Sequence, residues 1–254
     1  MTNQPEVQEK KLKKGFYLLP NLFTTAALFA GFYAVVAAMK GMFDIAAMAI
    51  FIAMVADGLD GRVARLTNTQ SAFGAEYDSL SDMISFGIAP ALVAYSWGLH
   101  TLGKLGWLSA FVYAAATALR LARFNTSTSS NDKRFFYGLP CPAAAAVVAS
   151  TIWVLQLLSL RNDFLIFIVG VVTILMGVLM LSNVRYHSFK QVDLKGRVPF
   201  IAIIILVLVF VGIALDPPVI LFLGFVGYAI SGPIMMLFLS KPKRFKKRDN
   251  HHEE

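Results

Sequence analysis

Long apolar stretches dominate this 254-residue chain and decide what kind of fold it can adopt. A helix needs about 20 mostly apolar residues to cross a bilayer, and each stretch approaches that length. Hydrophobic residues make up 57% of the chain and charged residues 15%, which is too apolar for a soluble domain. We therefore predict an all-α integral membrane protein with eight transmembrane helices, at residues 16–38, 42–65, 79–99, 105–124, 140–159, 163–182, 198–215 and 218–240.

Basic residues are distributed unevenly between the two sides of the predicted membrane protein. If the N-terminus is cytoplasmic, all of the 23 lysines and arginines except Lys40, Lys104 and Arg161 lie on the cytoplasmic side. The positive-inside rule then predicts a multi-pass protein of the cell (inner) membrane with both termini cytoplasmic. Anionic lipid headgroups account for the net charge of +8, so membrane lipids and not nucleic acid are the expected partners.

The apolar stretches leave little chain for a separate soluble domain. We expect a cytoplasmic N-terminal arm at residues 1–15, a membrane core at 16–182, a cytoplasmic loop with two additional transmembrane helices at 183–240, and a basic cytoplasmic tail at 241–254. The first apolar stretch is longer than a signal-peptide core and should be retained. Because Cys141 is the only cysteine, an intrachain disulfide is excluded.

Four aspartates interrupt the apolar pattern between residues 57 and 82. Asp57 and Asp60 are three residues apart and Asp78 and Asp82 four apart, so each pair shares one helix face. A turn around residues 67–75 is expected to bring both pairs to the cytoplasmic end. We expect Asp78 and Asp82 to open a helix and gain from its dipole, whereas the other pair lies toward a helix C-terminus.

Carboxylates that converge at low dielectric need cations. Arg62 and Arg65 would neutralise only half of the charge, whereas two divalent ions would neutralise all of it. Oxygen ligands favour hard ions such as Mg²⁺ or Mn²⁺, and a pair of ions about 3.5 to 4 Å apart clamps the attacking and leaving oxygens of a phosphoryl displacement. Gly61 and Gly74 would either admit a flat ligand or serve helix packing. The acids therefore indicate phosphoryl chemistry.

The same stretch carries a longer motif. It reads Asp57-x-x-Asp60-Gly61-x-x-Ala64-Arg65, then eight residues, then Gly74-x-x-x-Asp78-x-x-x-Asp82. All eight fixed positions match the signature of the CDP-alcohol phosphotransferases, which this chain therefore resembles. The resemblance implies a six-helix catalytic core at 16–182, usually homodimeric, that opens to the cytoplasmic leaflet. It also implies a CDP-linked lipid substrate and two divalent cations, Mg²⁺ or Mn²⁺.

The resemblance also implies residue roles. The expected metal ligands are Asp57, Asp60, Asp78 and Asp82, and Asp82 is in addition the expected catalytic base. The expected nucleotide-binding residues in the motif are Asp57, Gly61, Ala64, Arg65 and Gly74, with Arg65 as a charge partner near the diphosphate. Asn21 and Thr24, in the segment PNLFT, resemble family positions that line the nucleotide pocket.

Three further segments bear on the acceptor alcohol. ALRLARFN at 118–125, FYGLPCPAAA at 136–145 and SNVRYHSFK at 182–190 resemble the branch of this family that uses L-serine, which also tends to have eight helices. Arg120 and Arg123 stand three residues apart on one helix face, followed by Asn125, and would suit a phosphate or the serine carboxylate. The same arginines could instead be membrane anchors that snorkel.

Together these features predict transfer of the phosphatidyl group of CDP-diacylglycerol to the hydroxyl of L-serine. The expected route is a two-metal-assisted direct displacement, in which Asp82 takes the hydroxyl proton and CMP leaves. One alternative is the same chemistry on glycerol 3-phosphate, inositol phosphate or choline. A more distant alternative is a cation-coupled membrane transporter, since intramembrane acids also mark ion pathways.

Overall fold

The computed structural model describes residues 5–126, 135–187 and 200–239. Its first part contains α1 (Pro5–Met39), α2 (Phe43–Leu66), α3 (Ala72–Asp82), the π-helical turn η1 (Met83–Ile88), α4 (Ala89–Trp97), the 3₁₀ helix η2 (Leu99–Leu102) and α5 (Lys104–Thr126). The second part contains β1 (Phe135–Tyr137), α6 (Cys141–Leu157), α7 (Asp163–Leu181), β2 (Arg185–His187), α8 (Phe200–Leu215) and α9 (Pro217–Leu239). The fold is therefore helical, with one short antiparallel pair of strands, β1 and β2.

Each of the eight predicted apolar stretches coincides with a helix, the third being divided among α3, η1 and α4. Within the described ranges, four segments are long and apolar enough to cross a membrane: Pro20–Met39, Lys104–Thr126, Asp163–Leu181 and Pro217–Met236. They identify an integral membrane protein. The count of eight spans stays a prediction, because α2 carries acidic residues and α6 is only 17 residues long. The basic tail at 241–254 lies outside the described residues, and α1 already begins within the predicted arm.

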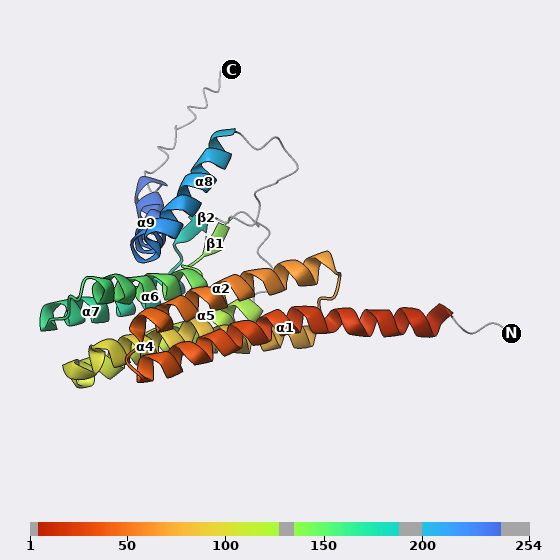
Figure 1. Cartoon of the computed structure of the whole chain (residues 1–254), viewed down its shortest axis with the longest axis horizontal. Coiled ribbons are helices and arrows are strands. Elements are labelled where there is room, and N and C mark those ends of the chain that lie inside the picture. Colours follow the sequence, from red (N-terminus) through yellow and green to blue (C-terminus); the bar gives the residue numbers. More distant parts are fainter. Residues whose placement is uncertain (1–4, 127–134, 188–199, 240–254) are drawn as a thin grey trace, which may run out of the picture.

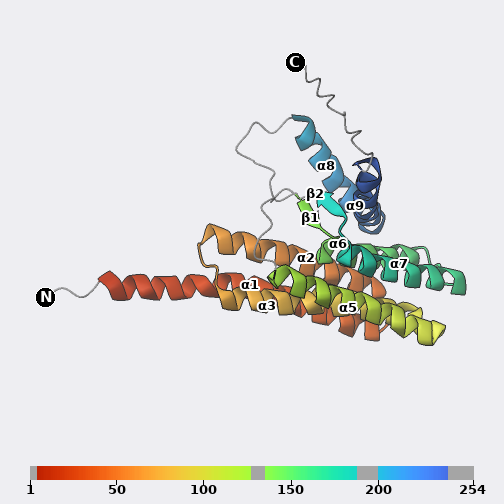
Figure 2. The same cartoon turned by 180° about the vertical axis from the view of Figure 1, so that it is seen from behind.

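The helices α1 to α7 lie side by side in one bundle, and α9 packs against this bundle through α6 and β2 (Figures 1 and 2). α1 and α2 form an antiparallel hairpin whose turn passes through Gly41, where φ is +75°. Glycine is favoured there because a side chain would be strained at that angle. Residues 143–149 of α6 are all buried, and five of these seven are alanine. Small side chains of this kind let helices approach closely in a membrane.

Two serine hydroxyls join the chain after the first hairpin to α1. Ser81 Oγ donates to the carbonyl of Thr24 over 3.1 Å, and Ser85 Oγ donates to the carbonyl of Ala27 over 3.0 Å. Gly31 permits this close approach, because a Cβ at Gly31 would lie 2.6 Å from the Cα of Ser85. These contacts fix α3 and η1 against α1, and so fix the position of the aspartates that α3 carries.

The helix that carries Asp78 and Asp82 begins earlier than expected. Ser71 is its N-cap and accepts a hydrogen bond from the Gly74 amide over 3.0 Å, so α3 starts at Ala72. The expectation that these acids open a helix is therefore wrong: Asp78 lies in the second turn and Asp82 is the last residue of α3. The dipole at the helix start does not favour their charge, which strengthens the need for a cation.

The π-helical turn η1 follows Asp82 directly and ends just before Pro90. Proline has no amide hydrogen, so it cannot donate to the carbonyl one turn earlier. The Phe86 carbonyl instead accepts the hydroxyl of the buried Tyr113, from α5, over 2.9 Å. π-helical turns are often found at functional sites, and this one connects the acidic end of α3 to the apolar interior of the bundle.

Candidate active site

Three of the four aspartates meet between α2 and α3. One carboxylate oxygen from each of Asp57, Asp60 and Asp78 lies within 4.8 Å of the other two. Asp60 is only 5% exposed, and the other two are half-buried. Carboxylates this close repel one another unless a cation or a proton is shared between them. Three hard oxygen donors fit Mg²⁺ or Mn²⁺, so the residues present suit the divalent ion that the sequence predicts.

Asp82 stands one helical turn beyond Asp78. Its carboxyl is in hydrogen-bonding contact with that of Asp57 and within electrostatic range of Asp78 and Asp60. It is also within electrostatic range of the thiol of Cys141, at the start of α6. All four predicted acids therefore converge, but Asp82 lies outside the compact group of three. This offset suits a residue that acts on a substrate next to the metal site.

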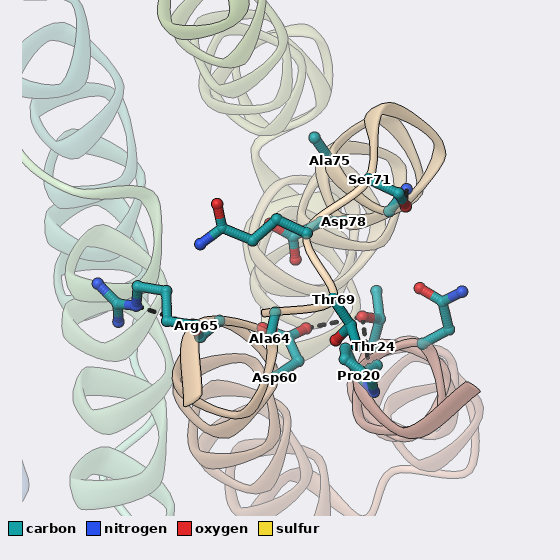
Figure 3. A pocket seen from close by; sticks show the side chains of 13 residues that line it. Pro20, Thr24, Asp60, Ala64, Arg65, Thr69, Ser71, Ala75 and Asp78 are labelled. Atoms are coloured by element: carbon teal, nitrogen blue, oxygen red, sulfur yellow. Dashed lines mark hydrogen bonds between the residues drawn. The ribbon is translucent and has the colours of Figure 1, made fainter. Parts of the chain in front are cut away.

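A cavity of about 310 Å³ opens beside the acids and is walled by α1, α2, α3 and the turn between α2 and α3 (Figure 3). Asp60 and Asp78 belong to its lining, so the cavity is continuous with the acidic group. Six of the seven residues predicted to bind the nucleotide line it as well: Asn21, Thr24, Gly61, Ala64, Arg65 and Gly74. The seventh, Asp57, is not among the lining residues. Gly61 leaves open space where a Cβ would point, so a ligand can approach the α2 backbone there.

Sequence reasoning missed part of the cavity wall. The additional lining residues are Pro20, Thr69, Gln70, Ser71 and Ala75. Most of them belong to the turn before α3 or to its first residues. The Ser71 N-cap, three residues before the motif glycine Gly74, was the available signal, because a serine at this distance marks a helix start.

Thr24 connects α1 to the acidic group. Its Oγ1 donates to Oδ2 of Asp60 over 2.8 Å and also lies 3.2 Å from the carbonyl of Pro20. Thr24 is itself buried, and its own carbonyl accepts the Ser81 hydroxyl. The hydroxyl therefore fixes the position of one oxygen of the Asp60 carboxylate.

Thr24→Val is expected to lower the affinity of the protein for Mn²⁺ about tenfold, as losses of supporting hydrogen bonds around metal ligands do. Valine keeps the shape of threonine but removes the donor to Asp60. Titration of purified protein with Mn²⁺, followed by electron paramagnetic resonance, measures the change. Thr25→Val is the matched control, because Thr25 Oγ1 pairs with the Tyr77 hydroxyl at 2.9 Å and not with an acid. Equal affinities in all three proteins would contradict the assigned role of Thr24.

Arg65 lines the cavity, but its guanidinium points away from Asp60 and Asp78 (Figure 3). Its Nε donates to the carbonyl of Gly61 over 2.9 Å, within the same helix. This arrangement leaves Arg65 exposed at the rim of the cavity. Its predicted role as a charge partner near a diphosphate therefore stays a prediction.

The three predicted acceptor-binding residues contact three different parts of the chain. Arg120 Nη1 donates to Cys141 Sγ, at the start of α6, over 3.3 Å. Arg123 Nη2 donates to Asn183 Oδ1, after α7, over 3.0 Å, and Asn125 Nδ2 donates to Ser79 Oγ in α3 over 3.0 Å. Arg120 is half-buried and Arg123 is exposed. Of the two arginines, the structure therefore places Arg120 deeper in the bundle.

The chain is similar to proteins of one known family. The family model described as CDP-alcohol phosphatidyltransferase matches residues 17–182. A Helicobacter pylori protein named CDP-diacylglycerol–serine O-phosphatidyltransferase is 42% identical over 201 residues, which cover 77% of this chain and 82% of that protein. A Bacillus subtilis protein of the same name is 32% identical over 68% of this chain and 92% of its own length. A Methanocaldococcus jannaschii protein, again so named, is 38% identical over 56% of this chain and 63% of its own.

The matched segment begins in α1, contains all four aspartates and ends just after α7, so it includes every residue that lines the cavity. The chain belongs to the CDP-alcohol phosphatidyltransferase family.

Proposed function

We propose that this protein is a CDP-diacylglycerol–serine O-phosphatidyltransferase, which makes phosphatidylserine and CMP from CDP-diacylglycerol and L-serine. The observation that carries the proposal is a cavity that opens directly onto a group of converging carboxylates, in a membrane-embedded bundle. The shared name of the relatives from three organisms supports serine as the acceptor.

The cavity is the proposed site of the cytidine and its diphosphate. Asn21 and Thr24 approach it from α1, and Gly61, Ala64 and Gly74 present little or no side chain on the opposite walls. A flat base fits between such surfaces. Arg65 stands at the rim, where its guanidinium would meet an anionic group of the nucleotide.

Asp57, Asp60 and Asp78 would hold a divalent cation, Mg²⁺ or Mn²⁺, and Asp82 would contribute to the site of a second. When bound, such ions neutralise the charge that develops on the diphosphate oxygens and stabilise the departing CMP. Asp57 would also lie next to the nucleotide. The contact between the carboxyl groups of Asp57 and Asp82 supports a shared site, because two carboxylates meet this closely only when a proton or cation lies between them.

Asp82 is the proposed general base. Its carboxylate accepts the proton of the serine hydroxyl, and the hydroxyl oxygen forms a bond to the lipid-side phosphorus of CDP-diacylglycerol. The bond from this phosphorus to the CMP oxygen breaks in the same step, so the products are phosphatidylserine and CMP. Arg120, Arg123 and Asn125 are proposed to orient the acceptor, whose carboxylate suits a guanidinium.

The division of the chain into segments, and their placement in the membrane, are also proposals. Residues 16–182 would form the six-helix catalytic core, 183–240 a loop and two additional spans, 1–15 a cytoplasmic arm and 241–254 a basic cytoplasmic tail. The concentration of lysines and arginines on one side supports cytoplasmic termini and a cytoplasmic active site in the inner membrane. A homodimer is expected from the family resemblance.

Product identification tests the proposed function. Purified protein in mixed micelles should convert CDP-diacylglycerol and L-serine to equal amounts of phosphatidylserine and CMP, measured by mass spectrometry. Glycerol 3-phosphate, inositol phosphate and choline serve as competing acceptors and should yield at most a few per cent of the product. A preference for one of them would replace serine as the acceptor. Absence of CMP release with every alcohol would contradict the reaction class.

A further inference from the structure

Helix α3, the π-helical turn η1 and helix α4 form one continuous helix from residue 72 to residue 97, with Asp78 and Asp82 in its first half. The backbone stays helical at both ends of η1, with φ and ψ of −58° and −40° at Met83 and of −61° and −52° at Ala89. The bonding in η1 is different, since the Ala89 amide donates to the carbonyl of Ile84, five residues earlier. A change in η1 is therefore passed directly to Asp82, the residue before it.

A buried stripe runs along this helix at a spacing that an α-helix would not keep on one side. Its members are at most 2% exposed and follow one another every four residues: Ser81, Ser85, Ala89, Val93 and Trp97. In an α-helix of roughly 3.6 residues per turn, residues four apart drift around the axis by about 40° at each step. A π-turn has more residues per turn and offsets part of this drift. The π-turn η1 therefore sets how α3 is rotated relative to α4.

Consecutive residues hold η1 to two neighbouring helices. Ser85 Oγ donates to a carbonyl of α1 over 3.0 Å. The Phe86 carbonyl accepts the hydroxyl of Tyr113, from α5, over 2.9 Å, and Tyr113 is fully buried. The next residue also lies against α5, because a Cβ at Gly87 would be 3.1 Å from Cγ2 of Thr117. The turn is thus fixed between α1 and α5, and Tyr113 provides its hydrogen bond to α5.

The Tyr113 hydroxyl takes the place of a backbone donor that the sequence removes. In an α-helix the carbonyl of Phe86 would accept the amide of the residue four positions later. That residue is Pro90, which has no amide hydrogen. A buried carbonyl without a donor is costly, so the hydroxyl of Tyr113 stabilises the chain in the π-helical form.

We propose that Tyr113 is a positioning residue of the active site. Its hydroxyl holds η1 in the π-helical form, and η1 holds α3 at the rotation that brings Asp78 and Asp82 to the acids of α2. The inference rests on the proposed function, because it concerns the residues proposed as metal ligands and as the base. Tyr113 is not among the residues that line the nucleotide cavity. It acts through the backbone of α3 and has no direct part in the chemical step.

The test is Tyr113→Phe, which removes the hydroxyl and keeps the buried ring. The affinity for Mn²⁺, measured by electron paramagnetic resonance, should fall about tenfold, because two of the four acids shift. The kcat for serine-dependent CMP release should fall about 10- to 100-fold, the effect of a small misplacement of reacting groups. The thermal unfolding temperature should fall by about 2 to 4 °C, the effect of one lost hydrogen bond.

Tyr186→Phe is the matched control. Tyr186 of β2 is also fully buried, and its hydroxyl also donates to a backbone carbonyl, that of Ala229 in α9, over 3.0 Å. This variant should lose a similar amount of thermal stability and keep its Mn²⁺ affinity and kcat within about a factor of two of the wild type. Equal losses of Mn²⁺ affinity in Tyr113→Phe and Tyr186→Phe would overturn the proposal, because general destabilisation would then explain both.

A double variant, Tyr113→Phe with Pro90→Ala, separates the shape of η1 from the stability of the protein. The new alanine has an amide that can donate to the Phe86 carbonyl, so the unfolding temperature should return at least to that of the wild type. The Mn²⁺ affinity and kcat should stay low, because the chain at η1 then favours an ordinary α-helix. Recovery of all three quantities would overturn the proposal, and so would a failure of the unfolding temperature to recover.

The proposal and the proposed function can fail separately. Wild-type values of Mn²⁺ affinity and kcat in Tyr113→Phe would overturn the role of Tyr113 and leave the proposed function intact. Wild-type protein that releases no CMP with any alcohol would refute the proposed function, and the Mn²⁺ affinities of the variants would still decide whether Tyr113 positions the acids.

Discussion

Asp82→Asn should lower kcat for serine-dependent CMP release about 10³-fold, with a KM for CDP-diacylglycerol close to that of the wild type. General bases contribute about 10²- to 10⁴-fold, and asparagine has the size of aspartate but cannot accept the hydroxyl proton. The nucleotide cavity does not include Asp82 in its lining, so binding of the lipid substrate should persist. Initial rates of CMP release at varied concentrations of each substrate measure both parameters.

The control for Asp82→Asn is the same change at Asp44. This aspartate is exposed in the first turn of α2, at the opposite end of that helix from the acidic group. Asp44→Asn should leave kcat within a factor of two. If Asp82 served only as a metal ligand, added metal would restore the activity of Asp82→Asn. Added metal would not replace a lost base. A kcat of Asp82→Asn that recovers at high Mn²⁺ would therefore contradict the assignment of Asp82 as the base.

Removal of divalent cations should abolish CMP release, with a loss of at least about 10⁴-fold. Asp57, Asp60 and Asp78 place their oxygens within 4.8 Å of one another, and without cations their repulsion would also disturb the cavity wall. Extensive dialysis against a chelator, followed by addition of Mg²⁺ or Mn²⁺, should remove and then restore the activity. CMP release that survives complete chelation would exclude a metal-dependent reaction.

A binding measurement separates loss of the metal from loss of the fold. Electron paramagnetic resonance should detect bound Mn²⁺ in the wild type and weaker binding in Asp60→Asn, since Asp60 is the most buried of the three ligands. The helical circular dichroism signal should be unchanged in both proteins. Asp163→Asn, in the first turn of α7 and far along the chain from the acids, should bind Mn²⁺ as the wild type does.

Local sequence patterns predicted the helices and the convergence of the acidic side chains well. The apolar stretches coincide with helices because burial in lipid requires about 20 consecutive apolar residues, a property that any short window of sequence reveals. The aspartates converge as their spacing predicts, because residues three or four apart share a helix face. For the same reason Asn21 and Thr24 of α1, and Gly61 and Ala64 of α2, each reach the nucleotide cavity as a pair.

Hydropathy did not predict where α3 begins or which residues the two arginines contact. Hydropathy rises only after Asp78, whereas α3 begins at Ala72 because the Ser71 side chain caps it. The spacing of Arg120 and Arg123 suggested one shared binding face, but the first contacts α6 and the second contacts Asn183 after α7. Their partners come from helices that are distant in sequence, and no local pattern specifies them.

The sequence by itself therefore determined that the chain is a helical membrane protein with an acidic motif whose oxygens could hold a metal ion, because length, hydropathy and spacing within one helix are local properties. Only the tertiary structure decided which elements face one another: that Thr24 of α1 holds Asp60 of α2, and that Tyr186 of β2 donates a hydrogen bond to the backbone of α9. The physical reason is that apolar periodicity specifies which face of a helix is buried, whereas the partner of that face is chosen by close packing at small residues such as Gly31 and Gly232.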